Sequence, residues 1–194
     1  MGEGAATASP GLGSGVRPAT FRSIGELAEL CGRYCWIERR MFELTGSRAS
    51  RPASAASAAS EAGDAEIRVV LSAMSAGHAF LAAQWRDRLP VRAGVDAEAL
   101  IVPPPGRLPE ALSLIEAEPR LALVLGGVAT QVLPRLEDGY RQHLALASPV
   151  SEAPVRAVLE WAARSTAGEI RTARVLLQRV GPDGEGAPAG GEFR

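Results

Sequence analysis

The sequence contains no lysine and no asparagine, and it has only two cysteines and two histidines among its 194 residues. Every basic side chain apart from the histidines is therefore an arginine, and the formal net charge is −1. Acidic and basic residues are therefore nearly equal in number. This argues against the basic surface that is typical of proteins that bind nucleic acid or anionic membranes. A GC-rich bacterial genome explains the missing lysine and asparagine most simply, so we expect a bacterial protein without a nucleic-acid partner.

Long hydrophobic runs are also missing. No stretch of about 20 residues is free of charged side chains, so we expect neither a transmembrane helix nor a membrane partner. Residues 1–20 are rich in Gly, Ala and Ser and lack an apolar segment, so no signal peptide is expected. These absences predict a cytoplasmic protein. No Gly-x-Ser-x-Gly nucleophile motif and no glycine-rich phosphate-binding pattern occurs either.

The two cysteines lie four residues apart on one predicted helix, at Cys31 and Cys35. Their side chains leave that helix on the same side, which is poor geometry for a disulfide. We expect both to fill volume in the core as small apolar side chains. A thiolate metal pair is the alternative, although no second pair completes the spacing of a zinc site.

Four long segments show the hydrophobic periodicity of amphipathic helices. They span about residues 21–44, 65–89, 120–146 and 151–180. Pro134 lies inside the third segment and should kink it or loosen one of its turns. No segment shows sustained period-two alternation, so a β-sheet is not predicted.

The connections between these helices differ in length. Only a few residues join the third and fourth helices, which makes them antiparallel neighbours. Residues 90–119 join the second and third, and this segment is long enough to run the full length of the helices. It can also carry a short amphipathic helix with Leu108, Leu112 and Ile115 on one side. The sequence therefore predicts an all-α domain over residues 21–180, a ferritin-like four-helix bundle with one long crossover between helices two and three.

The remaining segments have too little apolar surface to pack. Residues 47–63 form an Ala/Ser-rich run of low complexity, which we expect to be a mobile loop. Residues 1–20 and 181–194 have a similar Gly/Ala/Pro character and are expected to be disordered tails.

Three polar residues stand where the helices should be apolar. Glu38, His78 and Glu169 each lie near the middle of the apolar face of a different predicted helix. Burying a carboxylate without a partner costs several kcal/mol, so each of these groups must be paired, protonated or bound to a metal. A metal site and a hydrogen-bonded polar network both satisfy that requirement.

This layout resembles the ferritin-like superfamily of carboxylate-bridged di-iron proteins. Those proteins take a Glu from the first and third helices and a Glu-x-x-His pair from the second and fourth. Glu38, His78 and Glu169 match three of these six positions. Ser75 stands where the second helix should supply Glu, and Thr172 stands where the fourth should supply His. The third helix offers no inward carboxylate at its middle, only Gln131, Val128 and Val132.

Two stretches of sequence carry the resemblance further. The residues from His78, HAFLAAQWRDRLP, and those around Pro134, VLPRLEDGYRQHL, look like uncharacterised ferritin-like proteins of high-GC bacteria. The resemblance covers about residues 21–180. It implies the ferritin-like fold together with a degenerate di-iron site.

Two functions are compatible with such a site. Two irons need bridging carboxylates, which are missing here, so the first is a non-catalytic bundle that acts as a scaffold or interaction protein without a cofactor. The second is a metal-dependent oxidase or hydroxylase. In that case Glu38, His78 and Glu169 bind a single divalent Fe, Mn or Zn ion, and the catalytic residues are unknown.

Structural roles explain the other candidate residues better than metal binding or electron transfer does. His143 falls on the inward side near the end of the third helix, where the helix dipole or a partner contact is a better explanation than metal binding. The aromatic residues should serve packing rather than an electron relay: Tyr34, Trp36, Trp85, Tyr140 and Trp161. Apolar residues around Val124 and Leu133 could supply the surface for a homodimer.

Overall fold

The computed structural model describes residues 22–51, 61–91, 93–94 and 96–180. The predicted tails, residues 1–20 and 181–194, and most of the predicted loop at 47–63 lie outside these described residues. Within the described part of the chain every regular element is helical and no β-strand occurs. The all-α prediction is therefore confirmed. Of the helices that the structure describes, none combines the length and apolar content needed to cross a bilayer.

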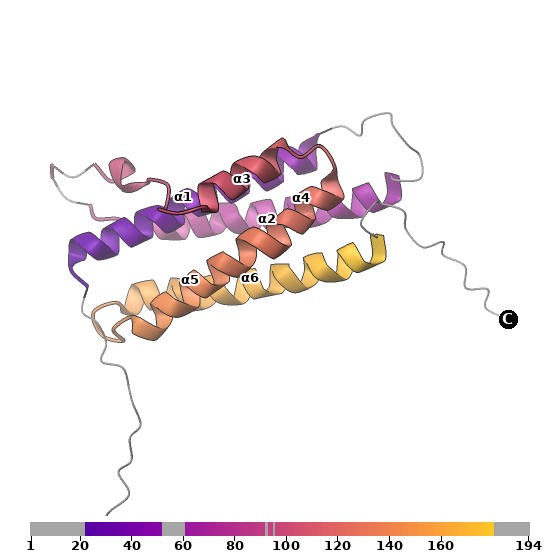
Figure 1. Cartoon of the computed structure of the whole chain (residues 1–194). Coiled ribbons are helices and arrows are strands. Elements are labelled where there is room, and N and C mark those ends of the chain that lie inside the picture. Colours follow the sequence, from indigo (N-terminus) through magenta and orange to yellow (C-terminus); the bar gives the residue numbers. More distant parts are fainter. Residues whose placement is uncertain (1–21, 52–60, 92, 95, 181–194) are drawn as a thin grey trace, which may run out of the picture.

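Four long helical segments lie side by side (Figure 1). Three are single helices, and the third segment consists of two helices joined by a π-helical turn. In chain order they are α1 (Ile24–Ser50), α2 (Glu61–Arg86), α4 (Leu121–Gly127) with the turn Val128–Val132 and α5 (Leu133–Leu146), and α6 (Ala153–Val180). The α4–α5 segment runs in the same direction as α2 and opposite to α1 and α6 (Figure 1).

The connection between α2 and α4 brings the chain back along the molecule. It contains a short 3-10 turn, Glu98–Leu100, and the helix α3 (Leu108–Ala117). α3 lies against α1, where Arg40 forms an ion pair with Glu116 at 2.7 Å. Its Leu112 and Ile115 are buried, so the short amphipathic helix expected in this connection is present.

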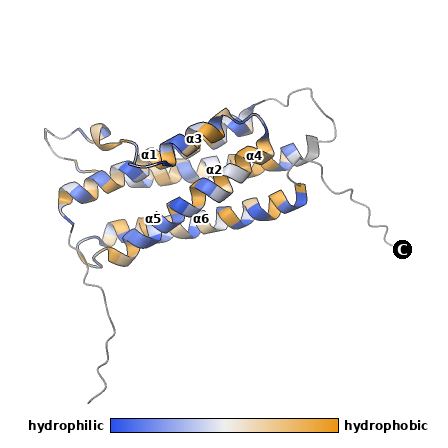
Figure 2. Cartoon of the chain, viewed as in Figure 1, coloured by the Kyte–Doolittle hydropathy of each residue, from blue (hydrophilic) through white to orange (hydrophobic). Residues whose placement is uncertain are grey.

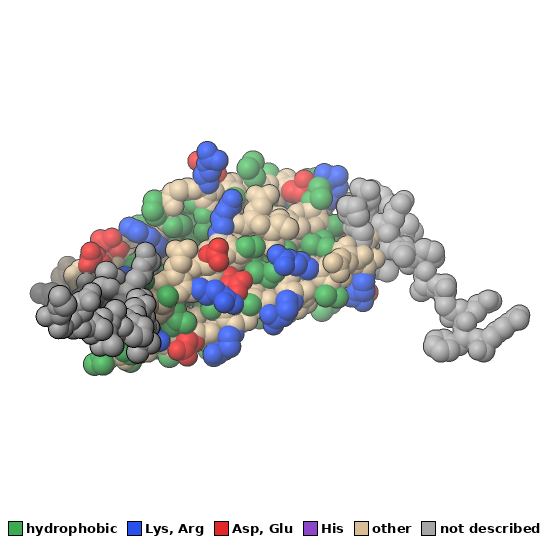
Figure 3. Space-filling model, turned by 60° about the horizontal axis from the view of Figure 1, so that its bottom comes forward, with side chains coloured by type: hydrophobic (Ala, Val, Ile, Leu, Met, Phe, Trp, Pro, Cys, Tyr) green, Lys and Arg blue, Asp and Glu red, His purple; other side chains and the backbone are tan. Residues whose placement is uncertain are grey.

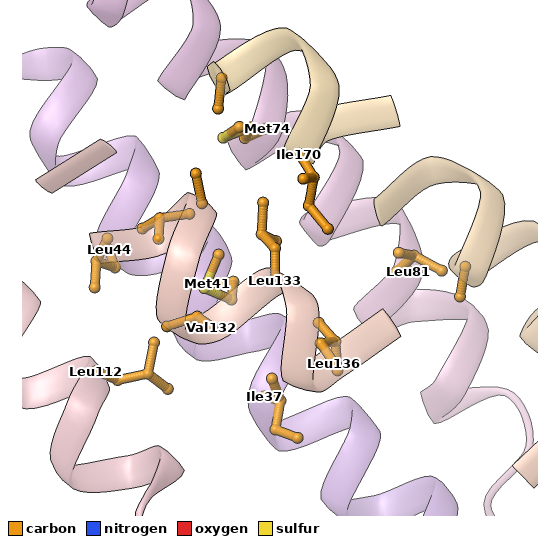
Figure 4. Packing of buried hydrophobic residues seen from close by; sticks show 14 of the residues in the cluster. Ile37, Met41, Leu44, Met74, Leu81, Leu112, Val132, Leu133, Leu136 and Ile170 are labelled. Atoms are coloured by element: carbon orange, nitrogen blue, oxygen red, sulfur yellow. The ribbon is translucent and has the colours of Figure 1, made fainter. Parts of the chain in front are cut away.

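The buried apolar side chains of the helices form one core. Hydrophobic and hydrophilic residues alternate along each of these helices (Figure 2). Met41 of α1, Met74 of α2, Leu133 of α5 and Ile170 of α6 are among the side chains drawn in Figure 4. Cys31 and Cys35 are free and fully buried, as expected.

The suggestion that Val124 and Leu133 offer surface for a homodimer is wrong. Both residues are completely buried. The third helical segment turns these side chains into the core that it shares with its neighbours. A contact between copies of the chain would have to use other residues.

Two helix boundaries differ from the sequence prediction. α1 passes through Gly46 and continues to Ser50, beyond the predicted end near residue 44. A Cβ atom on Gly46 would lie 2.8 Å from the Ser75 hydroxyl oxygen, so this glycine permits the close approach of α1 and α2. α2 begins at Glu61, four residues before the predicted start near residue 65. Both ends of the predicted loop at 47–63 are therefore helical.

Pro134 loosens one turn of the third segment, as its position predicts. The backbone N–H of Leu133 donates to the carbonyl of Val128, five residues back, which makes the turn a π turn. A π turn contains one residue more than an α turn, so later residues shift by one position around the helix. Tyr140 is completely buried, whereas the neighbouring Gly139, which the uninterrupted periodicity places inward, is half-buried.

Gly32 should be the least replaceable glycine of α1. A Cβ atom there would lie 2.1 Å from the carbonyl oxygen of Leu100, a backbone atom that cannot move alone. We expect Gly32→Ala to lower the free energy of unfolding by about 1–3 kcal/mol in urea denaturation. Gly25→Ala is the matched control in the same helix. Its Cβ would meet nothing closer than 3.9 Å, so it should be neutral or stabilising by about 0.5–1 kcal/mol. Equal effects of the two changes would contradict this account.

Candidate functional site

The structure brings Glu38, His78 and Glu169 together from α1, α2 and α6. The imidazole of His78 lies between the two carboxylates. Its Nδ1 atom is 2.5 Å from Glu38 Oε2, and its Nε2 atom is 3.5 Å from Glu169 Oε2. Because a carboxylate can only accept in this hydrogen bond, Nδ1 carries the proton and donates it toward Glu38.

Glu38 is fully buried and both of its oxygens are engaged. Oε2 accepts from His78, and Oε1 accepts a short hydrogen bond from the hydroxyl of Tyr140 in α5. Glu38, His78 and Tyr140 are all completely inaccessible to solvent, whereas the side chain of Glu169 remains 14% exposed. The network is thus closed around Glu38 and open toward solvent only at Glu169.

Charge and burial oppose each other at the two ends of the imidazole. Burial lowers the pKa of His78, but the charge of Glu38 and its hydrogen bond outweigh that effect, so this pKa lies above its usual value. Burial raises the pKa of Glu169 to about 7, and the attraction of His78 offsets only part of the rise. Both groups therefore hold a proton more tightly than they would in water. Nε2 of His78 and Oε2 of Glu169 are buried and make no hydrogen bond among the described residues.

The three residues do not form a common metal site in this arrangement. Glu38 and Glu169 lie at different nitrogens of His78, and the lone-pair directions of these two nitrogens point apart. A single ion with bonds of about 2.0–2.2 Å cannot touch both carboxylates and the ring without rotation of His78. In the described part of the chain no group of three or more His, Cys, Asp or Glu side chains is placed to hold a metal ion.

The other positions of the di-iron pattern have different roles. The hydroxyl of Ser75 donates to the carbonyl of Phe42 on α1 at 3.1 Å, so it joins two helices. Val128 and Val132 are fully buried in the apolar core. Thr172 lines a surface cavity between α2 and α6. None of these side chains compensates for a missing carboxylate or imidazole, so the residues present do not fit a di-iron centre.

Aromatic rings connect this network to a second buried polar cluster. Tyr34, Trp85 and Tyr140 lie with ring centroids 4.8–5.8 Å apart. The hydroxyl of Tyr34 is 3.3 Å from Nδ1 of His143, whose Nε2 lies 3.2 Å from Glu152. Tyr34, Trp85 and Tyr140 therefore pack the core, as predicted, and the two tyrosines also supply hydroxyl groups to buried polar partners. Trp161, for which packing is also predicted, is exposed instead.

His143 belongs to this second cluster. It stands in the last turn of α5, which agrees with the helix-dipole interpretation, and it is buried, so the alternative of a partner contact is wrong. Burial lowers the pKa of His143, and the nearby positive charge of Arg22 lowers it further, against the hydrogen bond to Glu152. Glu152 stands just before α6 and also accepts from the backbone N–H of Ser148 at 3.3 Å. This cluster fastens the short connection between α5 and α6.

Two residues of these networks were missed in the sequence. The sequence predicts only a packing role for Tyr140, which lies one position off the inward face of an uninterrupted third helix. The signal that could have found it is Pro134, since a π turn before it shifts the stripe by one residue. Glu152 lies at the start of the fourth predicted helix, where periodicity alone indicates no partner for it. His143 lies at the other end of the same short connection, and a buried imidazole needs a hydrogen-bond partner. That requirement could have identified Glu152.

A surface cavity of about 330 Å³ gives Glu169 access to solvent. It lies between α2 and α6, and its lining includes Val69, Met74, Ser165, Glu169 and Thr172. Neither histidine of the described residues is visible on the molecular face drawn in Figure 3, which fits their burial. Glu169 is therefore the only member of the Glu38–His78–Glu169 network that a molecule in solvent could reach directly.

Searches against protein-family models, curated proteins and solved structures return no match for this chain. Its function therefore has to be inferred from the chemistry of its own residues.

The raised pKa of Glu169 predicts a stability that falls as pH rises. Between pH 4.5 and about 7 the folded state keeps a proton on Glu169 that the unfolded chain has released, so each step up in pH favours unfolding. The raised pKa of His78 acts in the same direction above its usual value of 6.5. Glu169→Gln should therefore make the free energy of unfolding fall less steeply with pH. Relative to the native chain, the variant should gain about 2 kcal/mol of stability between pH 5 and pH 8.

The measurement is urea denaturation at a series of pH values. Glu160→Gln is the control, since this glutamate is exposed on the same helix and should leave the profile unchanged. Parallel profiles for the native chain and Glu169→Gln would show that Glu169 does not titrate in this way.

Proposed function

We propose that the chain is a ferritin-like four-helix bundle in which a hydrogen-bonded network replaces the di-iron centre, and that it acts as a non-catalytic binding or scaffold protein. Its connectivity supports the first part of this proposal. Two antiparallel helix pairs, α1–α2 and α5–α6, are joined by one long connection, which is the arrangement of ferritin-like bundles.

The engagement of Glu38 is the observation that carries the non-catalytic role. Its two oxygens accept from His78 and Tyr140, so the atoms that would bind a metal are already used within the protein. Proton donors at both oxygens satisfy the buried charge without an ion. Ser75 and Thr172 at the vacant ligand positions agree with such a site.

An interaction role is supported by the surface between α2 and α6. Large apolar side chains are exposed along these two helices: Val69, Phe80, Trp161 and Val175. Exposed apolar groups that share one face commonly mark a binding surface. A protein partner or a second copy of the chain would cover this face.

A metal-dependent oxidase or hydroxylase is the second candidate, and one observation favours it. Nε2 of His78 and Oε2 of Glu169 are buried without hydrogen bonds and lie 3.5 Å apart. Two donors on one tetrahedral ion are separated by about 3.3 Å, so these two atoms could share an ion. Glu38 would then orient His78 from its other nitrogen, as carboxylates do behind metal-bound histidines.

Metal content separates the two candidates. We expect protein purified anaerobically to hold Fe, Mn and Zn well below one equivalent, and His78→Gln to leave these levels unchanged, because Glu38 and Tyr140 already satisfy the network. Elemental analysis and titration with each divalent ion would measure this. His143→Gln is the matched control, since it removes the other buried histidine. About one equivalent of metal that is lost in His78→Gln but kept in His143→Gln would favour the enzyme instead.

A further inference from the structure

A second cavity lies between α2 and α6, away from the Glu38–His78–Glu169 network. Its volume is about 380 Å³, which is in the range of sites for small molecules. On the α2 side it is lined by Phe80, Gln84 and Arg88, which follow one another at four-residue spacing. On the α6 side it is lined by Ala157, Val158 and Trp161. We call it the Arg88 cavity.

One wall of the Arg88 cavity is an exposed aromatic pair. The rings of Phe80 and Trp161 lie 4.6 Å apart between centroids, at 68°, in an edge-to-face contact. Phe80 is 51% exposed and Trp161 is 37% exposed, although both are large apolar residues. Together with Val158 they offer flat apolar surface that a planar or aliphatic group could cover.

Arg88 brings a cation to the same cavity. Nε of Arg88 is buried and makes no hydrogen bond within the described part of the chain. No ion pair joins Arg88 to a carboxylate of the described residues, although several other arginines on the surface have one. The buried Nε is closed to a ligand. The terminal guanidinium nitrogens make no hydrogen bond among the described residues and keep contact with solvent, so they can bind an acceptor from outside the chain.

We propose that the Arg88 cavity binds a small organic carboxylate with a planar apolar body. The guanidinium of Arg88 matches the two oxygens of a carboxylate, and the amide of Gln84 lies one helical turn away as a further donor. The apolar body would rest against Phe80, Val158 and Trp161. One cation among mostly apolar walls suits a monoanion with a large apolar part better than a phosphate, which carries more charge and needs more donors.

This inference deepens the binding role proposed above by naming a ligand class, and it is independent of the metal question. None of the residues that line the Arg88 cavity belongs to the Glu38–His78–Glu169 network. The His78→Gln variant should therefore bind the carboxylate as the native chain does, whatever its metal content.

Indole-3-acetate is a suitable probe, with indole-3-acetamide as its uncharged counterpart and inorganic phosphate as a competitor. We expect calorimetry to show binding of the acetate, with the acetamide weaker by about 10-fold or more. Phosphate should not compete. Shifts of the Trp161 indole signal in NMR would place the ligand.

Three variants of the full chain test the residues. Arg88→Gln should weaken acetate binding by about 10-fold or more, because it removes the charged donor. Ala157→Leu should also weaken binding, since it fills the cavity from an exposed position and leaves the charge in place. Arg164→Gln is the matched control, because it removes an exposed arginine of α6 outside the cavity.

Several results would overturn the proposal. They are the absence of acetate binding by the native chain, equal binding of acetate and acetamide, an unchanged affinity in Arg88→Gln, and an equal loss in Arg164→Gln. Displacement of the acetate by phosphate at similar concentration would point instead to a general anion site.

Discussion

The buried carboxylate of Glu38 holds α1, α2 and α5 in register. A carboxylate removed from water costs several kcal/mol unless donors replace the lost hydration. Here the donors are Nδ1–H of His78 and the hydroxyl of Tyr140. They come from α2 and α5, whereas Glu38 is on α1. One charge therefore fixes three helices relative to one another, and a shift of any of them would leave a buried polar group unsatisfied.

Two local features make this arrangement attainable. Gly46 lets α1 and α2 approach closely at Ser75, and the π turn before Pro134 rotates Tyr140 into the core. The polar network is less enclosed on its α6 side. Glu169 stays partly exposed beside a cavity, and the apolar and charged groups used in our binding proposal lie along α2 and α6. The molecule thus combines a closed polar core with a more open α2–α6 face, which is where both of our binding proposals lie.

Much of the fold follows from periodicity in the sequence. The four long helical segments, the short helix in the long connection and the loosened turn at Pro134 were all predictable, because each depends on local spacing. The convergence of Glu38, His78 and Glu169 followed from the same spacing. The C-terminal end of α1 and the start of α2 were not predictable. Gly46, which could have ended α1, instead permits the close contact between α1 and α2. Tyr140 and Glu152 were missed because their roles depend on a one-residue phase shift and on a partner across a helix connection.

The protonation of the His78 ring tests the central claim most directly. If Glu38 accepts from His78, NMR of the native chain with ¹⁵N-labelled histidine should show a proton on Nδ1 that exchanges slowly with water, because the group is fully buried. Glu38→Gln should shift that signal strongly, whereas the signals of His143 should stay in place. A His78 Nδ1 that carries no proton, or a ring signal unaffected by Glu38→Gln, would contradict the network and with it the proposed replacement of the metal centre.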